Sequence, residues 1–281
     1  MTDLGLYWDD AFLAHEPPAG AFSLEATDLL AVAEPHPDSP DRVRNIKHIL
    51  TETLDVELRS VEPATDAQLA AVHEPAYLNR VRQAAETGPT RMNETTVAMS
   101  ETFEAVRYSA GAAIQVARAA LDEDSGPIPY APVRPSGHHA QPASADGFCF
   151  INNVAVATEA VLAEGLADSV AIVDWDVHHG NGTQEAFYGR NDVLTISIHG
   201  DHGPWNEETH PQTGRLDEPG SGEGEGYAVN IPLPLGTGDK GYELAFKRVI
   251  EPIIADFAPD LLLISAGQDG DANDPLGRNV L

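Results

Sequence analysis

The chain has a single cysteine, Cys149, only three lysines, and no long apolar run among its 281 residues. One cysteine excludes an internal disulfide and is typical of a protein in a reducing cytoplasm. Because no stretch of about 18 apolar residues occurs, we expect no transmembrane helix. Residues 1–4 have neither the basic start nor the apolar core of a signal peptide. These absences predict a cytoplasmic protein that does not associate with a membrane.

Basic residues are scarce: 16 Lys and Arg stand against 45 Asp and Glu, which gives a formal net charge of −29 at pH 7. Such a surface repels a phosphate backbone, so we expect no direct binding of nucleic acid. Attraction of cationic substrates, such as polyamines or lysine-rich tails, is one interpretation of the charge. The acidic residues are spread along the whole chain, and we therefore favour adaptation to a high-salt, halophilic cytoplasm.

Short apolar runs alternate with stretches of helical periodicity, which is typical of an α/β protein whose parallel sheet is covered by helices on both faces. The predicted strands cover residues 4–8, 56–61, 170–173, 193–198 and 261–264. The predicted helices cover residues 100–121, 153–163 and 240–257, and Pro252 should kink or divide the last of them. No repeat or linker divides the chain, so we predict a single domain over residues 1–281.

Two adjacent histidines, His138 and His139, follow a loop that contains proline and glycine. Strand ends are the usual location of sites in open α/β sheets, and both rings could project into a pocket there. A histidine pair by itself is weak support for a site, because such residues are as often solvent-facing or hydrogen-bonded for structural reasons. From the residues alone, both interpretations stay open.

A second polar group follows the predicted strand 170–173. Asp174, Asp176 and His178 are spaced two residues apart, so in an extended segment their side chains share one face. Carboxylate oxygen and imidazole nitrogen both bind divalent ions, and a strand end with a helix-capping aspartate does not explain three such groups together. Asp269, after another predicted strand, is ordinarily a turn residue. Here it would complete a set of three metal ligands and leave a fourth coordination position open for water, as catalytic zinc requires.

Five segments together resemble the histone deacetylase family, including its bacterial and archaeal amidohydrolase, acetylpolyamine and acetoin-utilization relatives. The segments are HPDSPDR at 36–42, RPSGHHA at 134–140, GFCFINNVA at 147–155, DWDVHHGNGTQ at 174–184 and SAGQD at 265–269. They occur in the family's order and cover nearly the whole chain. The resemblance implies a three-layer α/β/α, arginase/deacetylase-like fold with a mainly parallel central sheet.

The resemblance also implies roles for the polar groups. It makes Asp176, His178 and Asp269 the ligands of one zinc ion per chain, with iron(II) as an alternative metal because oxygen-rich ligation is permissive. It places His138 and His139 beside a water on that ion. His139 would be the general base and acid, and His138 would support the tetrahedral intermediate electrostatically.

Two further residues are implied as partners of the histidine rings: Asp174 for His138 and Asn181 for His139. Asparagine at this position, where some relatives have aspartate, resembles the class II branch of the family. A neutral partner raises the pKa of a histidine less than a carboxylate does, so His139 would act more readily as a base. No role is assigned to His179.

Other residues gain expected roles in the same way. Asp174 and Ser197 would contribute to a structural potassium site. Phe148 would line a narrow acyl-lysine channel, although core packing is the alternative, and Trp205 would belong to the opposite rim. Cys149 is expected to be buried filler, because no base is placed for a reactive thiol.

The implied reaction is hydrolysis of an acetyl amide, in protein acetyl-lysine or acetylpolyamine, to acetate and a free amine. The family sequence continues to a Gly-Gly-Tyr turn whose tyrosine donates to the developing oxyanion. This chain ends at Leu281, and its last tyrosine is Tyr242, so the C-terminal part of the family domain is expected to be missing and that role has no residue. An uncovered sheet edge would then favour association, for example as a homo-oligomer.

Two other functions remain open from the sequence. An arginase-like enzyme of the same fold would use two manganese ions to hydrolyse guanidines. Two-metal sites need extra bridging carboxylates, whereas His138, His139 and Asn181 at the flanking positions suit one metal better. The third possibility is a protein that binds acyl-lysine or small amines with weak or no turnover, which the missing tyrosine motivates.

Overall fold

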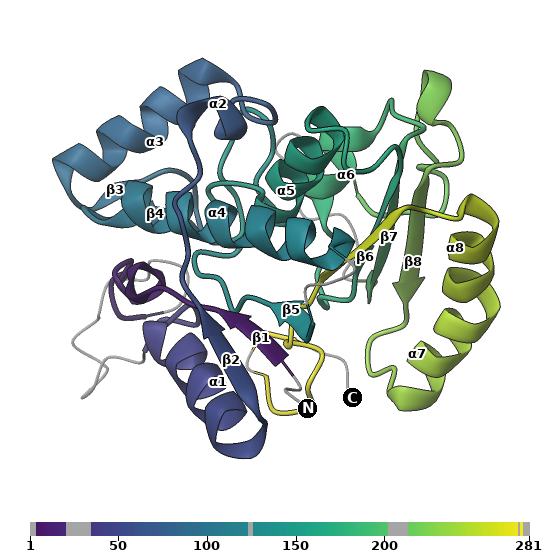
Figure 1. Cartoon of the computed structure of the whole chain (residues 1–281), viewed down its shortest axis with the longest axis horizontal. Coiled ribbons are helices and arrows are strands. Elements are labelled where there is room, and N and C mark those ends of the chain that lie inside the picture. Colours follow the sequence, from purple (N-terminus) through teal and green to yellow (C-terminus); the bar gives the residue numbers. More distant parts are fainter. Residues whose placement is uncertain (1–3, 21–34, 123–125, 202–212, 275, 278–281) are drawn as a thin grey trace. The chain divides into compact units, whose positions relative to one another are not determined.

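The computed structural model describes residues 4–20, 35–122, 126–201, 213–274 and 276–277 of the chain (Figure 1). Two compact units are present, an N-terminal unit, Met1–Ala163, and a C-terminal unit, Glu164–Leu281. Each unit has its own parallel sheet. The α/β class is confirmed, and the single domain over residues 1–281 stays a prediction. Among the described residues, no helix has the length and apolar character needed to cross a bilayer.

The sheet of the N-terminal unit has three parallel strands in the order β2 (Val56–Arg59), β1 (Leu4–Tyr7) and β5 (Ile128–Tyr130). The strands predicted at 4–8 and 56–61 are confirmed within a few residues. A short 3₁₀ helix, Asp10–Leu13, follows β1, and its Phe12 is fully buried. A second sheet of this unit is a small antiparallel hairpin of β3 (Thr90–Arg91) and β4 (Val97–Ala98).

The described part of the N-terminal unit contains five α-helices: α1 (Pro40–Thr53), α2 (Asp66–Leu69), α3 (Pro75–Thr87), α4 (Thr102–Leu121) and α5 (Asn153–Ala163). Local sequence explains the starts of the first three. Pro40 and Pro75 occupy first-turn positions, where the missing N–H is not needed, and Thr65 forms a capping box with Gln68 at α2. The buried face of α4 is rich in alanine, and Gly111 lies against the carbonyl of Glu62, where a Cβ would come within 2.0 Å.

The C-terminal unit has a four-stranded sheet in which every neighbouring pair is parallel. Its order is β8 (Ala228–Leu233), β7 (Val193–Gly200), β6 (Val170–Asp174) and β9 (Leu261–Ser265). Helix α6 (Asn181–Phe187) faces Ile172, Thr195 and Asn230 on one side of the sheet. A longer helical segment packs on the other side, against Val173, Ile196 and their neighbours. These are the three layers that the sequence predicts.

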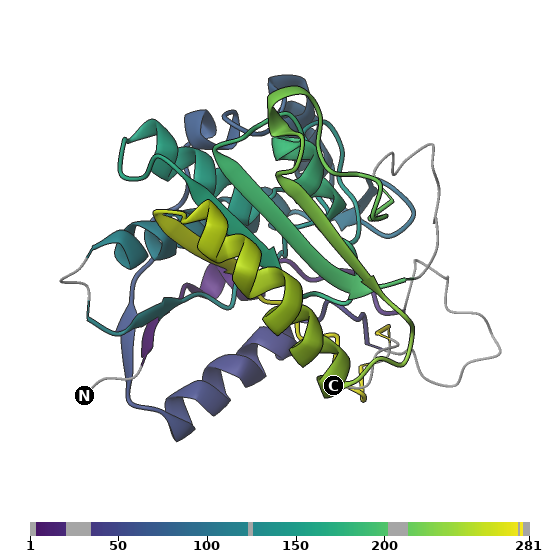
Figure 2. The ribbon, with the colours of Figure 1, turned by 90° about the vertical axis from the view of Figure 1, so that its right-hand side faces the viewer.

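The long helical segment divides as Pro252 predicts. Helix α7 (Asp239–Ala245) passes into a π-helical turn, Phe246–Ile250, and then into α8 (Glu251–Phe257). Figure 2 shows this helical segment in front of the sheet. Proline lacks an N–H and its ring clashes with the carbonyl four residues earlier, so the regular hydrogen-bond ladder cannot continue through this point. The change of pitch just before Pro252 has this cause.

One outer strand of this sheet differs from the sequence expectation, and the other, predicted at 261–264, agrees with it. Strand β8 was not predicted, because Pro232 interrupts its apolar pattern, but proline is tolerated on an edge strand. Strand β9 forms the other edge. Its Leu262 and Ile264 are 44% and 47% exposed, on the face that carries Ala171 and Val173 in the neighbouring strand.

Candidate metal centre

The carboxyl end of β6 presents acidic side chains in alternation with apolar ones. Trp175 packs into the core between the sheet and the α7–α8 segment, and Val177 is fully buried. Asp174 Oδ1 accepts a hydrogen bond from the backbone N–H of Asp176 at 3.0 Å, and Asp176 Oδ1 accepts one from the backbone N–H of His178 at 2.8 Å. The segment after the strand is therefore held by its own carboxylates.

Strand β9 brings the third residue to the same edge. Asp174 and Ser265 are register partners in the parallel pair of β6 and β9, so the two strands end side by side. Asp269 follows four residues after Ser265, and its Oδ1 accepts a hydrogen bond from the backbone N–H of Val177 at 2.9 Å. Gly267 permits this approach, because a Cβ there would lie 2.2 Å from Asp176 Oδ2.

Asp176, His178 and Asp269 consequently converge. His178 Nδ1 lies 3.1 Å from Asp176 Oδ1 and 2.8 Å from Asp269 Oδ2. Each residue offers one possible metal-ligand atom, and these three atoms lie within 4.8 Å of one another. Within the described ranges, no other group of three His, Cys or acidic residues meets this condition. Their side chains are 12–17% exposed, which leaves the group accessible from solvent.

The electrostatics of this group suit a cation. Burial is the largest single influence on His178 and lowers its pKa. Asp176 and Asp269 together outweigh burial, because their carboxylates are hydrogen-bonded to the ring and carry negative charge, and they raise the pKa of His178 to about 10. Burial, followed by the charge of Asp176, raises the pKa of Asp269. Two nearby carboxylates thus favour a positive charge between them. Two carboxylates and one imidazole nitrogen fit a divalent ion with three protein ligands and an open position.

The two adjacent histidines belong to the N-terminal unit. The rings of His138 and His139 lie next to each other, with centroids 3.9 Å apart and planes tilted by 44°. His138 is 7% exposed. Gly137 lies tightly against the backbone N–H of Asn153, where a Cβ would come within 2.6 Å. Sequence-predicted catalytic residues are therefore present in both units, the histidines in one and the metal-compatible triad in the other.

Arg134 anchors the loop that carries the histidines. Its guanidinium is fully buried and donates to Asp38 Oδ1 and to the carbonyls of Asp38, Phe12 and His15. Burial raises the pKa of the Asp38 carboxyl, and the charge of Arg134 acts in the opposite direction. Burial, followed by the charge of the nearby Arg134, lowers the pKa of His15 to about 3. His15 therefore stays neutral beside this pair.

The residues expected at a potassium site meet in the C-terminal unit. Asp174 and Ser197 are register partners on β6 and β7, and both line a small hollow with the start of α6. Ser197 Oγ accepts a hydrogen bond from the backbone N–H of Gly180 at 3.4 Å and lies 2.9 Å from His199 Nδ1. Asn181, the first residue of α6, is 3% exposed.

Of the two residues expected to line the substrate channel, the described part of the chain includes Phe148 but not Trp205. Phe148 lies in the N-terminal unit, where its ring meets His36 edge to face with centroids 5.0 Å apart. Cys149 beside it is buried, which agrees with the expected filler. Trp205 lies outside the described residues.

A polar network next to β7 was not predicted from the sequence. His179 Nε2 lies 2.9 Å from Gln184 Oε1, which also accepts from Asn230 Nδ2, so His179 Nε2 is assigned as a donor. Gln184 Nε2 in turn donates to Glu218, whose carboxylate also holds the backbone N–H of Gly214. His179 is thus part of a structural network. These partners come from three separate segments, residues 179–184, 214–218 and 230, so no single local motif could have identified the network.

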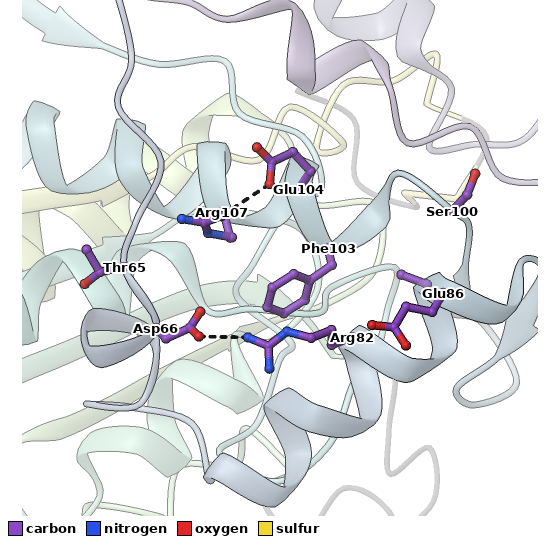
Figure 3. Close-up of a pocket in the computed structure, with 9 residues that line it drawn as sticks. Thr65, Asp66, Arg82, Glu86, Ser100, Phe103, Glu104 and Arg107 are labelled. Atoms are coloured by element: carbon purple, nitrogen blue, oxygen red, sulfur yellow. Dashed lines mark hydrogen bonds and ion pairs between the residues drawn. The ribbon is translucent and has the colours of Figure 1, made fainter.

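A surface groove of about 690 Å³ lies among α2, α3 and α4, as Figure 3 shows. Arg82 binds Asp66 Oδ2 at 2.9 Å and lies over the ring of Phe103, 4.5 Å from its centroid. Arg107 pairs with Glu104 at 3.4 Å. Because both arginines are paired with carboxylates and none of the predicted site residues lines the groove, we assign it no part in the chemistry.

Comparison with known proteins gives a consistent result. A model of the histone deacetylase domain matches residues 36–281. Histone deacetylase 8 of Arabidopsis thaliana is 40% identical over 281 residues, covering 98% of this chain and 74% of that protein. A histone deacetylase-like amidohydrolase of Pseudomonas aeruginosa is 36% identical over 280 residues, covering 98% and 72%.

Solved structures agree with the sequence matches. The HD domain of HDA15 superposes with a TM-score of 0.84 at 36% identity, covering 98% of this chain and 77% of that one. An acetylpolyamine aminohydrolase from Burkholderia pseudomallei gives a TM-score of 0.81 at 29% identity, covering 99% and 86%. The three-layer α/β/α fold predicted from the sequence is therefore confirmed.

Proposed function

The chain belongs to the histone deacetylase domain family, a family of hydrolases, and we propose that it is a zinc-dependent deacetylase that cleaves an acetyl amide to acetate and a free amine. The observation that carries this proposal is the convergence of Asp176, His178 and Asp269 at the carboxyl ends of β6 and β9. A family member with an accessible Asp-His-Asp set at this location has what a single catalytic metal needs.

The three side chains of the triad would hold the metal, with His178 binding through Nδ1, the nitrogen that faces both carboxylates. Zinc bound there would polarise the acetyl carbonyl and make a nearby water more acidic. The backbone hydrogen bonds that already hold one oxygen of each carboxylate would keep the ligands oriented before any ion binds.

Proton transfer is the task we propose for the histidine pair. His139 takes the proton of the attacking water and returns a proton to the leaving amine, which completes hydrolysis with no net proton consumed at the ring. His138, beside it, supports the negative charge that develops on the carbonyl oxygen. Asp174 and Asn181 are proposed as the respective partners that orient the two rings.

Two further parts of the expected site remain proposals. Asp174 and Ser197 would contribute oxygen ligands to a structural potassium ion, which their register pairing on β6 and β7 supports. Phe148 would line the channel for the acyl chain. The substrate would be an acetylated small amine or an acetyl-lysine protein, and the net charge of −29 would favour a positively charged substrate over a nucleic acid.

Metal content tests the first half of this proposal. We expect one zinc ion per chain by elemental analysis of the purified protein, and none in the Asp176→Asn, His178→Ala double variant. Two tightly bound ions per chain would instead favour an arginase-like ureohydrolase, because such enzymes need a bridged metal pair. Manganese and iron should be measured in the same samples.

Turnover tests the second half. We expect the zinc-loaded chain to release acetate from an acetyl-lysine peptide, from an N-acetylpolyamine, or from both, at high salt, and His139→Ala to abolish this. Tight binding of both substrates without acetate release would contradict the enzyme and support an acyl-amine binding protein. His48→Ala, a histidine on the outer side of α1, is the control that should leave turnover unchanged.

A further inference from the structure

A tight turn of the N-terminal unit, Asp146–Cys149, has an unusual backbone. The two end residues exchange both hydrogen bonds, at 3.0 Å and 2.7 Å, and the two central residues, Gly147 and Phe148, have φ of +49° and +67°. Glycine adopts such values freely, but a phenylalanine in the left-handed region carries a cost of about 1–2 kcal/mol. Interactions around the turn must hold Phe148 there.

One central residue touches a side chain with a proposed role, and the other has a proposed role itself. Gly147 lies so close to the ring of His139 that a Cβ would come within 2.1 Å of its Cδ2. Phe148, the proposed channel residue, has its ring in edge-to-face contact with His36. A small rotation of this turn would therefore shift both the backbone of Gly147 that packs against His139 and the aromatic ring of Phe148.

Two threonine hydroxyls hold the turn from outside. Thr95 Oγ1 accepts a hydrogen bond from the backbone N–H of Gly147 at 3.2 Å, and Thr96 Oγ1 accepts one from the backbone N–H of Phe148 at 3.1 Å. These are the backbone groups of the two left-handed residues. Thr96 is 1% exposed, so its hydroxyl is shielded from competing water.

Asn93 organises the two threonines. Its Oδ1 accepts hydrogen bonds from the backbone N–H groups of Thr95 and Thr96 at 2.9 Å and 2.8 Å. Its Nδ2 reaches across to the turn and donates to the carbonyl of Ala145 at 2.7 Å and to Asp146 Oδ1 at 3.1 Å. One asparagine thus fixes both the acceptors and the segment that they hold.

We propose that Asn93, Thr95 and Thr96, here called the polar clamp, are positioning residues that set the conformation of Gly147 and Phe148 for acyl-substrate binding. The inference rests on the proposed function, since it assumes that Phe148 lines the substrate channel. The clamp acts through Phe148 and Gly147 and touches no reacting atom. Its two threonines have separable targets: Thr96 controls the aromatic ring, and Thr95 controls the glycine packed against His139.

Thr96→Val tests the clamp, because valine keeps the shape of threonine and removes the acceptor. We expect exchange of the Phe148 backbone N–H with deuterium to become about five- to tenfold faster, as the loss of one buried hydrogen bond predicts. We also expect KM for an acetyl-lysine peptide to rise by about tenfold with kcat changed less than about threefold, because ground-state binding is what Phe148 contributes.

Two variants serve as controls. Thr96→Ser retains the hydroxyl and should restore both the exchange rate and KM to within about twofold of the wild type. Thr158→Val removes another buried threonine hydroxyl, one that donates to the carbonyl of Val154 within α5. It should lower the melting temperature without changing KM or the exchange of Phe148, so a purely structural effect is recognised by this pattern.

The possible results separate the clamp from the function. Unchanged exchange of Phe148 in Thr96→Val would overturn the clamp. Faster exchange with KM unchanged, or a fall in active fraction alone, would overturn its positioning role. If the zinc-loaded wild type turns over no acetyl amide, the proposed function fails. The positioning role is then tested by the dissociation constant of the acetyl-lysine peptide in place of KM. A dissociation constant that is unchanged in Thr96→Val again overturns the positioning role.

Discussion

The two regions that carry the candidate chemistry are built by different means. In the C-terminal unit, parallel strands β6 and β9 end side by side, and the short segments that follow them bring Asp176, His178 and Asp269 together. In the N-terminal unit, His138 and Phe148 lie in irregular segments held by buried side chains from distant parts of the chain. The carboxylates of the triad themselves accept hydrogen bonds from backbone N–H groups of the segment after β6, whereas the loops of the N-terminal unit depend on side chains from distant parts of the chain for the backbone groups that they bury.

Removal of a triad ligand should have the largest effect, because the sheet supplies no substitute. We expect Asp269→Ala to lower kcat on an acetyl amide by at least about a thousandfold and to reduce bound metal in parallel. The matched control is Asp260→Ala at the opposite end of β9, whose carboxylate caps the backbone of Asp168 and Ser169. That change should leave metal content intact, and equal losses in both variants would contradict a metal site at Asp269.

Loss of the buried arginine should be the largest stability effect in the N-terminal unit. We expect Arg134→Ala to lower the free energy of unfolding by about 3–5 kcal/mol in urea titration, because it leaves Asp38 and three carbonyl groups buried without their donor. Arg44→Ala, which removes an exposed ion pair with Asp41, should change it by less than about 1 kcal/mol. A small effect of Arg134→Ala would mean that the loop does not depend on this side chain.

Acid should weaken the N-terminal unit through His73. Its Nδ1–H donates to the carbonyl of Gln141 at 3.0 Å, and its Nε2 accepts from the backbone N–H of Asn152 at 2.9 Å, so the neutral ring is required. Burial lowers the pKa of His73 to about 4 against 6.5 in the unfolded chain. The unfolded state therefore binds more protons between these values, and stability falls as the pH falls from about 6.5 to 4.

The expected size of the acid effect is about 3 kcal/mol across that window, at about 1.4 kcal/mol for each unit of pKa difference. Urea titrations of the wild type and of His73→Gln at several pH values measure it. The variant should be less stable at pH 7 and should show a weaker decline towards pH 4. An identical decline in both proteins would assign the acid sensitivity to other groups.

Crowding the triad should produce the smallest of these effects. We expect Gly267→Ala to weaken zinc binding by about ten- to a hundredfold, because its Cβ would displace Asp176 Oδ2 without removing a ligand. Gly165→Ala is the control, since a Cβ there meets nothing within 4 Å, although its φ of +66° adds backbone strain. Competition with a metal-sensitive dye measures the affinity, and unchanged binding in Gly267→Ala would show that β9 is not held rigidly against β6.

The triad was more predictable than the loops for a physical reason. The alternation of Asp174, Asp176 and His178 follows from the two-residue period of extended chain, and Asp269 follows another apolar run. The side chains that hold residues 141–152 have no such period. His73, Asn93 and Thr96 lie in connections whose sequence resembles ordinary turns, and their contacts bridge 52 to 79 residues.

The sequence by itself determined the α/β class, the three metal-compatible side chains and the histidine pair, because periodicity and short motifs are local properties of a chain. Only the tertiary structure decided that β8 and β9 form the edges of the sheet in the C-terminal unit and that Gly267 makes room for a carboxylate. It also decided that a polar clamp holds Phe148 in a left-handed conformation. Those features depend on which distant segments meet, and burial together with hydrogen bonding of the whole fold selects them.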